Sequence, residues 1–225
     1  PVVTIENADV SLTPDANCSP VNGAATVTEI TVNGLGTGGV AGYTFAWYQS
    51  DGTTLVPLAG NAAAIATALA DGNYFVRATN TTSNCSSPVT PFTINDTHVN
   101  PAISAAATVN NSNCVGVTPN GSVTIQLNAG ADPVADYTIE WFEGNGTATP
   151  LGTTVGATAG ASNQTAQQLP AGTYTVRVTD NTTPNNGCVA TTTFTITDNL
   201  PVVTIENADV SLTPDANCSP VNGAA

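Results

Sequence analysis

The chain has 225 residues with 16 acidic side chains, two Arg and no Lys, so its formal net charge is −14. Such a surface repels phosphate backbones and anionic lipids, which argues against nucleic-acid binding and docking on a membrane surface. Hydrophobic residues make up 41% of the chain, enough for folded cores, and no apolar run is long enough to cross a bilayer.

The sequence of residues 1–25 is repeated identically at 201–225. A single folded unit has no physical reason to keep an identical stretch at this spacing, so we expect the chain to be a window on a longer tandem array. The repeat period divides again into two diverged halves that carry the same motifs in the same order. We therefore predict module 1 over 1–98, module 2 over 99–199 and an incomplete next module over 200–225.

The expected strands of module 1 are short runs in which apolar and polar residues alternate, which is typical of a strand with one buried face. In chain order they cover 25–32, 43–47, 69–77 and 92–94. Turn dipeptides separate them, namely Asn33-Gly34, Asp51-Gly52 and Asp71-Gly72.

Module 2 repeats this order over 122–127, 137–141, 169–178 and 194–196. Many short strands and a central Trp in about 100 residues predict an all-β fold of tandem immunoglobulin-like β-sandwich modules, with one disulfide each. The linkers at 95–101 and 197–201 are short and end in Pro, so we expect beads on a string that form a fairly stiff rod.

Four aromatic residues are predicted to belong to the two cores. Trp47 and Trp141 should fill the cores beside the cystines, and Tyr74 and Tyr174 each follow a Leu-x-x-Gly-x run in an arrangement similar to a tyrosine corner.

Five cysteines lie at 18, 85, 114, 188 and 218. Because Cys218 is the copy of Cys18, its partner is expected beyond the window, which leaves Cys18–Cys85 and Cys114–Cys188 as the predicted disulfides. Cys18 and Cys114 precede the first clear strand of their modules, so the bridges are expected to join loops at one pole of each sandwich. The alternative is that all five are buried free thiols. Disulfides indicate an oxidising compartment, outside the cell or on its surface.

Arg77 and Arg177 are the only cations apart from His98 and lie at equivalent positions. They are either anchors for carboxylate or sugar ligands or members of cross-strand ion pairs, and we favour an exposed pair of Arg177 with Glu140. Ala46 stands at the position equivalent to Glu140, so Arg77 needs a different partner.

Calcium between modules is a weaker hypothesis, with Asp96 and Asp198 as candidate ligands, because the carboxylates near the linkers are sparse. No other metal and no cofactor is expected. His98 is the only histidine and has no Ser or Cys partner in its sequence context, so the sequence predicts no catalytic residue and no enzyme.

Both halves share the pattern Cys … Asn-Gly … Tyr-x-(Phe/Ile)-x-Trp … Leu-x-x-Gly-x-Tyr-x-Val … Cys, beginning at Cys18 and at Cys114. This pattern resembles the repeats of very large surface adhesins of Bacteroidota, of which the gliding-motility adhesins are the best-known carriers. The resemblance implies export, covalent continuity over many modules, and a role in surface attachment or extracellular structure. The central inserts at 49–68 and 143–168 are longer than is typical of such repeats.

The sequence therefore predicts the shaft of a giant secreted or surface-anchored protein, forming an extended extracellular fibre. Its expected partners are the adjacent modules of the same chain and, laterally, other copies. The alternative function is binding of a glycan or a surface through the inserts, with repetition supplying avidity. The absence of aromatic residues from 49–73 and 144–173 favours the shaft.

Overall fold

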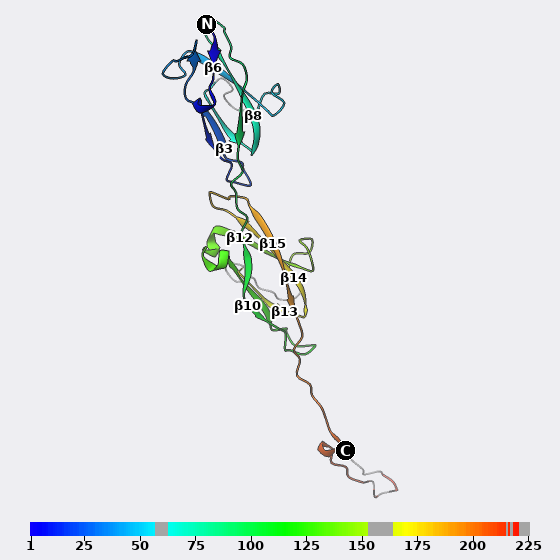
Figure 1. The fold of residues 1–225 in the computed structure, drawn as a ribbon. Helices are drawn as coiled ribbons and strands as arrows, with labels where there is room; N and C mark the ends of the chain where they lie inside the picture. Colours follow the sequence, from blue (N-terminus) through cyan, green and yellow to red (C-terminus); the bar gives the residue numbers. More distant parts are fainter. Residues whose placement is uncertain (57–62, 153–163, 215, 217, 221–225) are drawn as a thin grey trace.

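The computed structural model describes residues 1–56, 63–152, 164–214, 216 and 218–220. The strands among them, from β1 to β15, form two β-sandwiches placed end to end (Figure 1). The strands of module 1 are β1 (Val3–Thr4), β2 (Val10–Thr13), β3 (Gly23–Val27), β4 (Thr31–Val32), β5 (Leu35–Gly36), β6 (Tyr43–Tyr48), β7 (Ile65–Leu69), β8 (Gly72–Asn80) and β9 (Thr90–Ile94). Those of module 2 are β10 (Ile103–Val109), β11 (Gly121–Leu127), β12 (Tyr137–Glu143), β13 (Thr165–Leu169), β14 (Gly172–Asp180) and β15 (Val189–Ile196). Single-turn 3₁₀ helices are η1 (Asn7–Asp9), η2 (Asn128–Gly130), η3 (Val134–Asp136) and η4 (Asn207–Asp209).

Each module contains two three-stranded antiparallel sheets that face one another. Module 2 pairs β10-β11-β13 in one sheet and β12-β14-β15 in the other, and module 1 repeats this with β2-β3-β7 and β6-β8-β9. The two orders match the ABE and CFG sheets of an immunoglobulin-like sandwich. Module 1 adds a small sheet of β1, β4 and β5. The predicted all-β, immunoglobulin-like fold is therefore confirmed.

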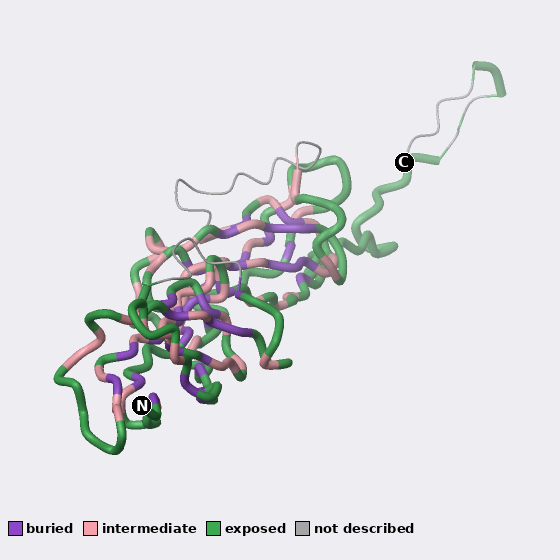
Figure 2. The backbone as a smooth tube through the Cα atoms, turned by 90° about the horizontal axis from the view of Figure 1, so that it is seen from above, coloured by how far each residue is buried: buried purple, intermediate pink, exposed green. Residues whose placement is uncertain are grey.

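Side chains that alternate along the strands form a separate core in each module. Figure 2 colours the buried stretches of the backbone purple. In β11, burial alternates along the whole strand, with Val123, Ile125 and Leu127 facing inward. The module 1 core draws on residues between 3 and 94, and that of module 2 on residues between 123 and 196. No core cluster of the described residues contains members of both modules, so each sandwich buries its own apolar surface.

The predicted core aromatics lie in these clusters. Trp47 and Trp141 are 1% and 6% exposed, and Trp47 meets Phe92 edge to face with ring centroids 5.6 Å apart. Tyr174 is buried, and Tyr74 is partly buried against the module 1 core.

Residues 201–214 lead away from module 2 and from both sandwiches, drawn as the orange trace in Figure 1, and contain the 3₁₀ turn η4 but no strand. Val3 and Ile5 are 3% and 6% exposed in module 1, whereas their copies Val203 and Ile205 are 83% and 79% exposed. The same sequence is thus core in one place and solvent-exposed in the other, because only module 1 supplies the sheets that cover it. No helix in the described part of the chain is long and apolar enough to span a membrane.

Candidate functional site at the joint between the modules

The disulfide of this structure joins the two modules. Cys18 of module 1 is bonded to Cys188 of module 2, with the two Cα atoms 4.8 Å apart, while Cys85, Cys114 and Cys218 are free. The predicted pairs Cys18–Cys85 and Cys114–Cys188 are therefore wrong, and so is the expectation of one disulfide within each module. The Trp side chains accordingly have no cystine beside them.

Strand direction explains the error. Cys18 lies just before β3, whose first residue Gly23 pairs with Leu69 at the pole of module 1 next to module 2. Cys85 follows β8, a nine-residue strand that starts at this pole and ends at the other. At about 3.3 Å per residue such a strand spans about 27 Å, whereas bonded cysteines have Cα atoms within about 7 Å. The two cysteines of one module therefore lie at opposite poles.

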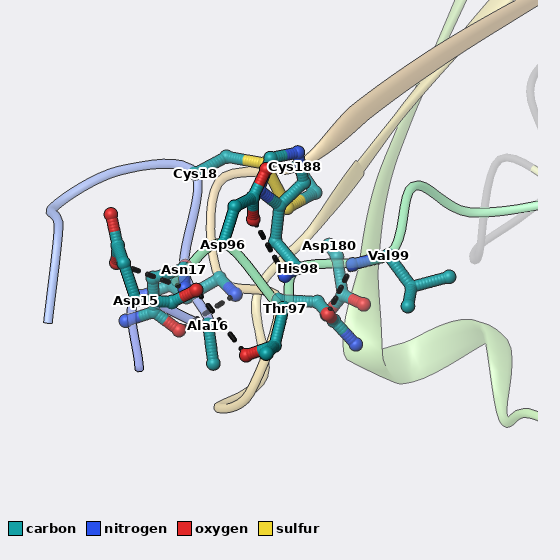
Figure 3. Close-up of a disulfide and its surroundings, with 12 residues drawn as sticks. Asp15, Ala16, Asn17, Cys18, Asp96, Thr97, His98, Val99, Asp180 and Cys188 are labelled. Atoms are coloured by element: carbon teal, nitrogen blue, oxygen red, sulfur yellow. Dashed lines mark hydrogen bonds and ion pairs between the residues drawn. A yellow bond between two sulfur atoms is a disulfide. The ribbon is translucent and has the colours of Figure 1, made fainter. Parts of the chain in front are cut away.

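We call the contact between residues 15–19, 95–99 and 180–188 the joint. Main-chain hydrogen bonds cross it beside the cystine: Cys18 N and Ser19 N donate to Asn186 O at 2.9 and 3.0 Å, and Asn185 N donates to Ala16 O at 2.7 Å. Figure 3 shows the cystine with the turn of module 1 on one side and the linker on the other. The disulfide is therefore part of a hydrogen-bonded interface between the two modules.

Side-chain amides add to the interface. Asn17, which is 6% exposed, accepts a hydrogen bond through Oδ1 from Asn186 N at 3.2 Å. Asn185 Oδ1 accepts one from Val99 N at 2.7 Å, which ties the linker to the β14–β15 loop. A buried polar side chain such as Asn17 is costly when unpaired, so its hydrogen bond to module 2 favours one orientation of the modules.

A buried acidic side chain organises the module 1 half of the joint. Asp15 is 4% exposed, and its Oδ1 accepts a hydrogen bond from Asn22 N at 2.9 Å. Its main-chain N–H donates to Asn95 O at 2.9 Å, and its carbonyl accepts from Thr97 N at 2.8 Å. The turn that carries Cys18 is therefore fixed to the start of the linker.

Gly187 permits the close approach of the two modules. Its φ is +77°, in the left-handed region that disfavours other residues, and an added Cβ would lie 2.5 Å from Ser19 O and 2.8 Å from Ser19 N. Any side chain at this position would push the β14–β15 loop away from module 1.

His98 lies beside the cystine, and its ring contacts the Asp96 carboxylate (Figure 3). The ligand atoms of Cys18, His98 and Cys188 lie within 4.8 Å of one another, a spacing that would suit a metal ion if both sulfurs were thiolates. In the disulfide the sulfurs carry no thiolate charge, so the chemistry of this cluster is a covalent cross-link.

The calcium candidates lie at the two linkers. Asp96 faces His98, and Asp198 Oδ1 accepts a hydrogen bond from Asn111 Nδ2 at 2.8 Å. Among the described residues, neither belongs to a group of three His, Cys, Asp or Glu side chains placed to share an ion.

The two arginines lie on the sheets, away from the joint. Arg177 pairs across strands with Glu140 as predicted, with Nη2 and Oε2 2.7 Å apart, and both side chains are more than a third exposed. Arg77 finds its different partner in Tyr48, donating to its hydroxyl at 2.7 Å. The Tyr48 interaction was not identified from the sequence, although Tyr48 directly follows the core Trp47.

Both tyrosine corners are present. Tyr174 donates its hydroxyl hydrogen to Pro170 O at 2.9 Å, and Tyr74 donates to Ala70 O at 3.2 Å. Burial is the main cause that raises the pKa of both phenols above 10.0, so each stays a donor at neutral pH.

Each insert is anchored on its own sandwich, although most of residues 49–55 and 143–150 are exposed. Val56 belongs to the module 1 core, Ala63 O accepts a hydrogen bond from Trp47 Nε1 at 3.1 Å, and Leu151 packs against the module 2 core. The middle of each insert, 57–62 and 153–163, lies outside the described residues.

Comparisons with known proteins show the following. No family model matches the chain, and no curated protein matches it. Among solved structures it is similar to the three N-terminal domains of the highly immunogenic outer capsid protein (Hoc) of bacteriophage RB49, at 15% identity and a TM-score of 0.41, covering 88% of this chain and 59% of that one.

Two further solved structures are less similar. The mouse coronavirus receptor-binding domain complexed with its murine receptor gives 16% identity and a TM-score of 0.30, covering 83% of this chain and 98% of that one. The fibronectin(III)-like modules of Clostridium thermocellum CbhA give 16% identity and a TM-score of 0.25, covering 84% and 94%. These likenesses, all with TM-scores below 0.5, say nothing about activity.

Proposed function

We propose that this chain is a piece of the repetitive shaft of a very large secreted or surface-anchored bacterial protein, which forms an extended extracellular fibre for adhesion or surface structure. The observation that carries the proposal is the joint, where a cystine and a set of main-chain hydrogen bonds fix two sandwiches end to end. A protein whose task is mechanical needs such a joint, because flexible linkers would let a chain of modules coil.

The charge of the chain supports the same function. With 16 acidic residues and two Arg, the modules repel one another along the rod and keep a long array soluble. The disulfide suits an oxidising, extracellular location. The polar side chains of the joint align the two modules, and we assign no enzymatic role to them.

Electron microscopy of the source cells, with antibodies raised against residues 1–200, tests this function. The expected result is labelling along extended fibres outside the cell. Labelling confined to the cell interior would refute the shaft.

A glycan array probed with one 200-residue period tests the binding alternative. We expect no specific binding, because residues 49–73 and 144–173 contain no aromatic side chain, and Val56 and Leu151 anchor the inserts on their own cores. Strong selective binding to one glycan class would instead make each module a multivalent adhesin.

A further inference from the structure

The far end of module 2 repeats the geometry of the joint. We call residues 111–120 and 197–200 the distal pole. Here Asn111 takes the place of Asp15: its N–H donates to Thr197 O at 3.0 Å, and its carbonyl accepts from Asn199 N at 2.7 Å. Each of the two residues also forms a parallel bridge with an aspartate of the following linker, Asp198 in the case of Asn111.

The cysteine-bearing turn of the distal pole is held in the same way. Asn120 Oδ1 accepts from Ser112 N at 2.8 Å, and Asn111 Oδ1 accepts from Asn120 N at 3.2 Å. The corresponding bonds in module 1 run from Ala16 N and Asn22 N, at 2.8 and 2.9 Å. Cys114 therefore occupies the place that Cys18 has in the joint.

The distal pole differs from the joint because, in the part of the chain that the structure describes, no second module packs against it. Cys114 is exposed, and beside it Val115, Val117 and Leu200 are 101%, 60% and 40% exposed. These residues line a pocket together with Pro119 and Pro170. Asn111, Asn113 and Asp198 also line this pocket, so the surface beside Cys114 offers both polar and apolar groups, at the place where the turn of module 1 receives Asn185–Cys188 in the joint.

Loop lengths identify the occupant. In the joint, the seven residues 181–187 of module 2 meet the three residues 19–21 that follow Cys18. In module 1 the loop before Cys85 is shorter, four residues over 81–84, whereas the distal-pole loop after Cys114 is longer, five residues over 115–119. The two facing loops together hold ten residues in the joint and nine in the proposed pair, so a copy of module 1 fits the distal pole.

We propose that the distal pole is a second joint of the same kind, in which Cys114 forms a disulfide with Cys85 of a following copy of module 1, begun by residues 201–225. This inference rests on the proposed function only in requiring that another module follows. Within one period Cys85 and Cys114 cannot meet, because Cys85 follows β8 at the pole of module 1 that faces away from the joint, and Cys114 lies at the distal pole of module 2. The exposed apolar copies Val203 and Ile205 become core when that module is completed.

The bond forms by two thiol–disulfide exchanges with an external disulfide, either a small molecule or a disulfide oxidoreductase. The Cys114 thiolate attacks one sulfur of that disulfide, which releases one thiol and leaves a mixed disulfide. The thiolate of the copied Cys85 then attacks the Cys114 sulfur and expels the second thiol. Two cysteine thiols are oxidised, and one external disulfide is reduced to two thiols.

A disulfide at every joint gives the fibre two covalent paths. Each joint is then crossed once by the peptide linker and once by a disulfide, so that one cut in a linker does not sever the rod. In an array where every period carries the Cys18–Cys188 bond, the covalent path through these disulfides follows the backbone only from Cys188 to Cys218, 30 residues of each period. At about 3.5 Å per residue, one period can lengthen to about 100 Å, compared with about 700 Å for an unlocked chain.

Thiol counting tests the proposal on two proteins, this chain and a two-period chain in which residues 1–200 occur twice in succession. Alkylation without reductant, read by mass spectrometry, should label Cys85, Cys114 and Cys218 in this chain. In the two-period chain the expected labels are only two, on the first Cys85 and the last Cys114. A digest with a protease that cuts at acidic residues should yield the first Cys114 peptide bonded to a Cys85 peptide.

Two matched variants identify the bond. Cys114→Ser in the first period should add one label, on the second Cys85, whereas Cys85→Ser in the first period should remove one label and leave the bond intact. Labelling of the first Cys114 and both Cys85 residues, with Cys18–Cys188 formed, would overturn the second joint without touching the shaft. Absence of all labels would indicate pairing within modules and overturn both the joint and its repetition.

Discussion

The Cys18–Cys188 bond should determine how far the chain can be stretched. When residues 1 and 225 are pulled apart, tension enters through 1–18, crosses the disulfide and leaves through 188–225. The 170 residues of separation between the two cysteines carry no load. At about 3.4 Å per residue, the disulfide keeps about 580 Å of contour length from contributing to the extension.

Single-molecule force spectroscopy measures this length directly. Without reductant we expect only short extension steps, from the removal of 1–18 and of residues after 188. With a thiol reductant, two module-sized unfolding steps should appear and the final length should increase by about 580 Å.

A triple variant makes the experiment decisive. Cys85→Ser, Cys114→Ser and Cys218→Ser together leave only the cysteines of the joint, so the variant should stretch like the parent chain. If the unreduced variant instead extends to the full length of the reduced chain, the joint has no disulfide and the account fails.

Three further predictions concern single residues. Gly187→Ala places a methyl group 2.5 Å from Ser19 O, so reductant should open the joint cystine several-fold faster while both modules stay folded. Tyr174→Phe removes the hydrogen bond to Pro170 O and should lower the unfolding free energy of module 2 by about 1 kcal/mol in urea titrations. Hydrogen bonds from Thr54 and then Thr53 lower the pKa of Asp51 from 3.8 to about 2, so its stabilising effect is complete above pH 4, is lost as the pH falls towards 2, and is absent in Asp51→Asn at every pH.

Controls exist for these changes. Gly146→Ala is matched to Gly187→Ala, since nothing lies within 4 Å of its added Cβ, and should leave the reduction rate unchanged. Equal rates for the two variants would mean that Gly187 does not hold the joint closed. For Tyr174, a loss near zero would contradict the corner hydrogen bond. For Asp51, melting temperatures of parent and variant that differ equally at pH 6 and pH 2 would contradict the pKa shift.

The sandwich was predictable because it depends on local patterns. Alternation in 122–127 and 137–141 specifies one buried face, and the structure has β11 and β12 there. The pair of Arg177 with Glu140 was predictable because alternation places both side chains on the outer face, and the two strands are neighbours in the sheet. Both predictions need only neighbouring strands of one module.

The disulfide was not predictable from cysteine spacing, because spacing does not say at which pole a residue lies. The signal was the run from Gly72 to Asn80, long enough to carry the chain from one pole to the other before Cys85. Tyr48 as the partner of Arg77 was missed because the contact is diagonal: the register sets Ala46 opposite Arg77, and the long Tyr48 side chain reaches Arg77 from two residues along β6.

Peptide mapping of the unreduced chain tests the central claim most directly. A digest at acidic residues, followed by mass spectrometry, should give one cross-linked species that contains Cys18 and Cys188, with Cys85 and Cys114 in separate peptides. Cross-linked species of Cys18 with Cys85 and of Cys114 with Cys188 would show that each module is closed on itself, and would contradict a covalent joint between modules.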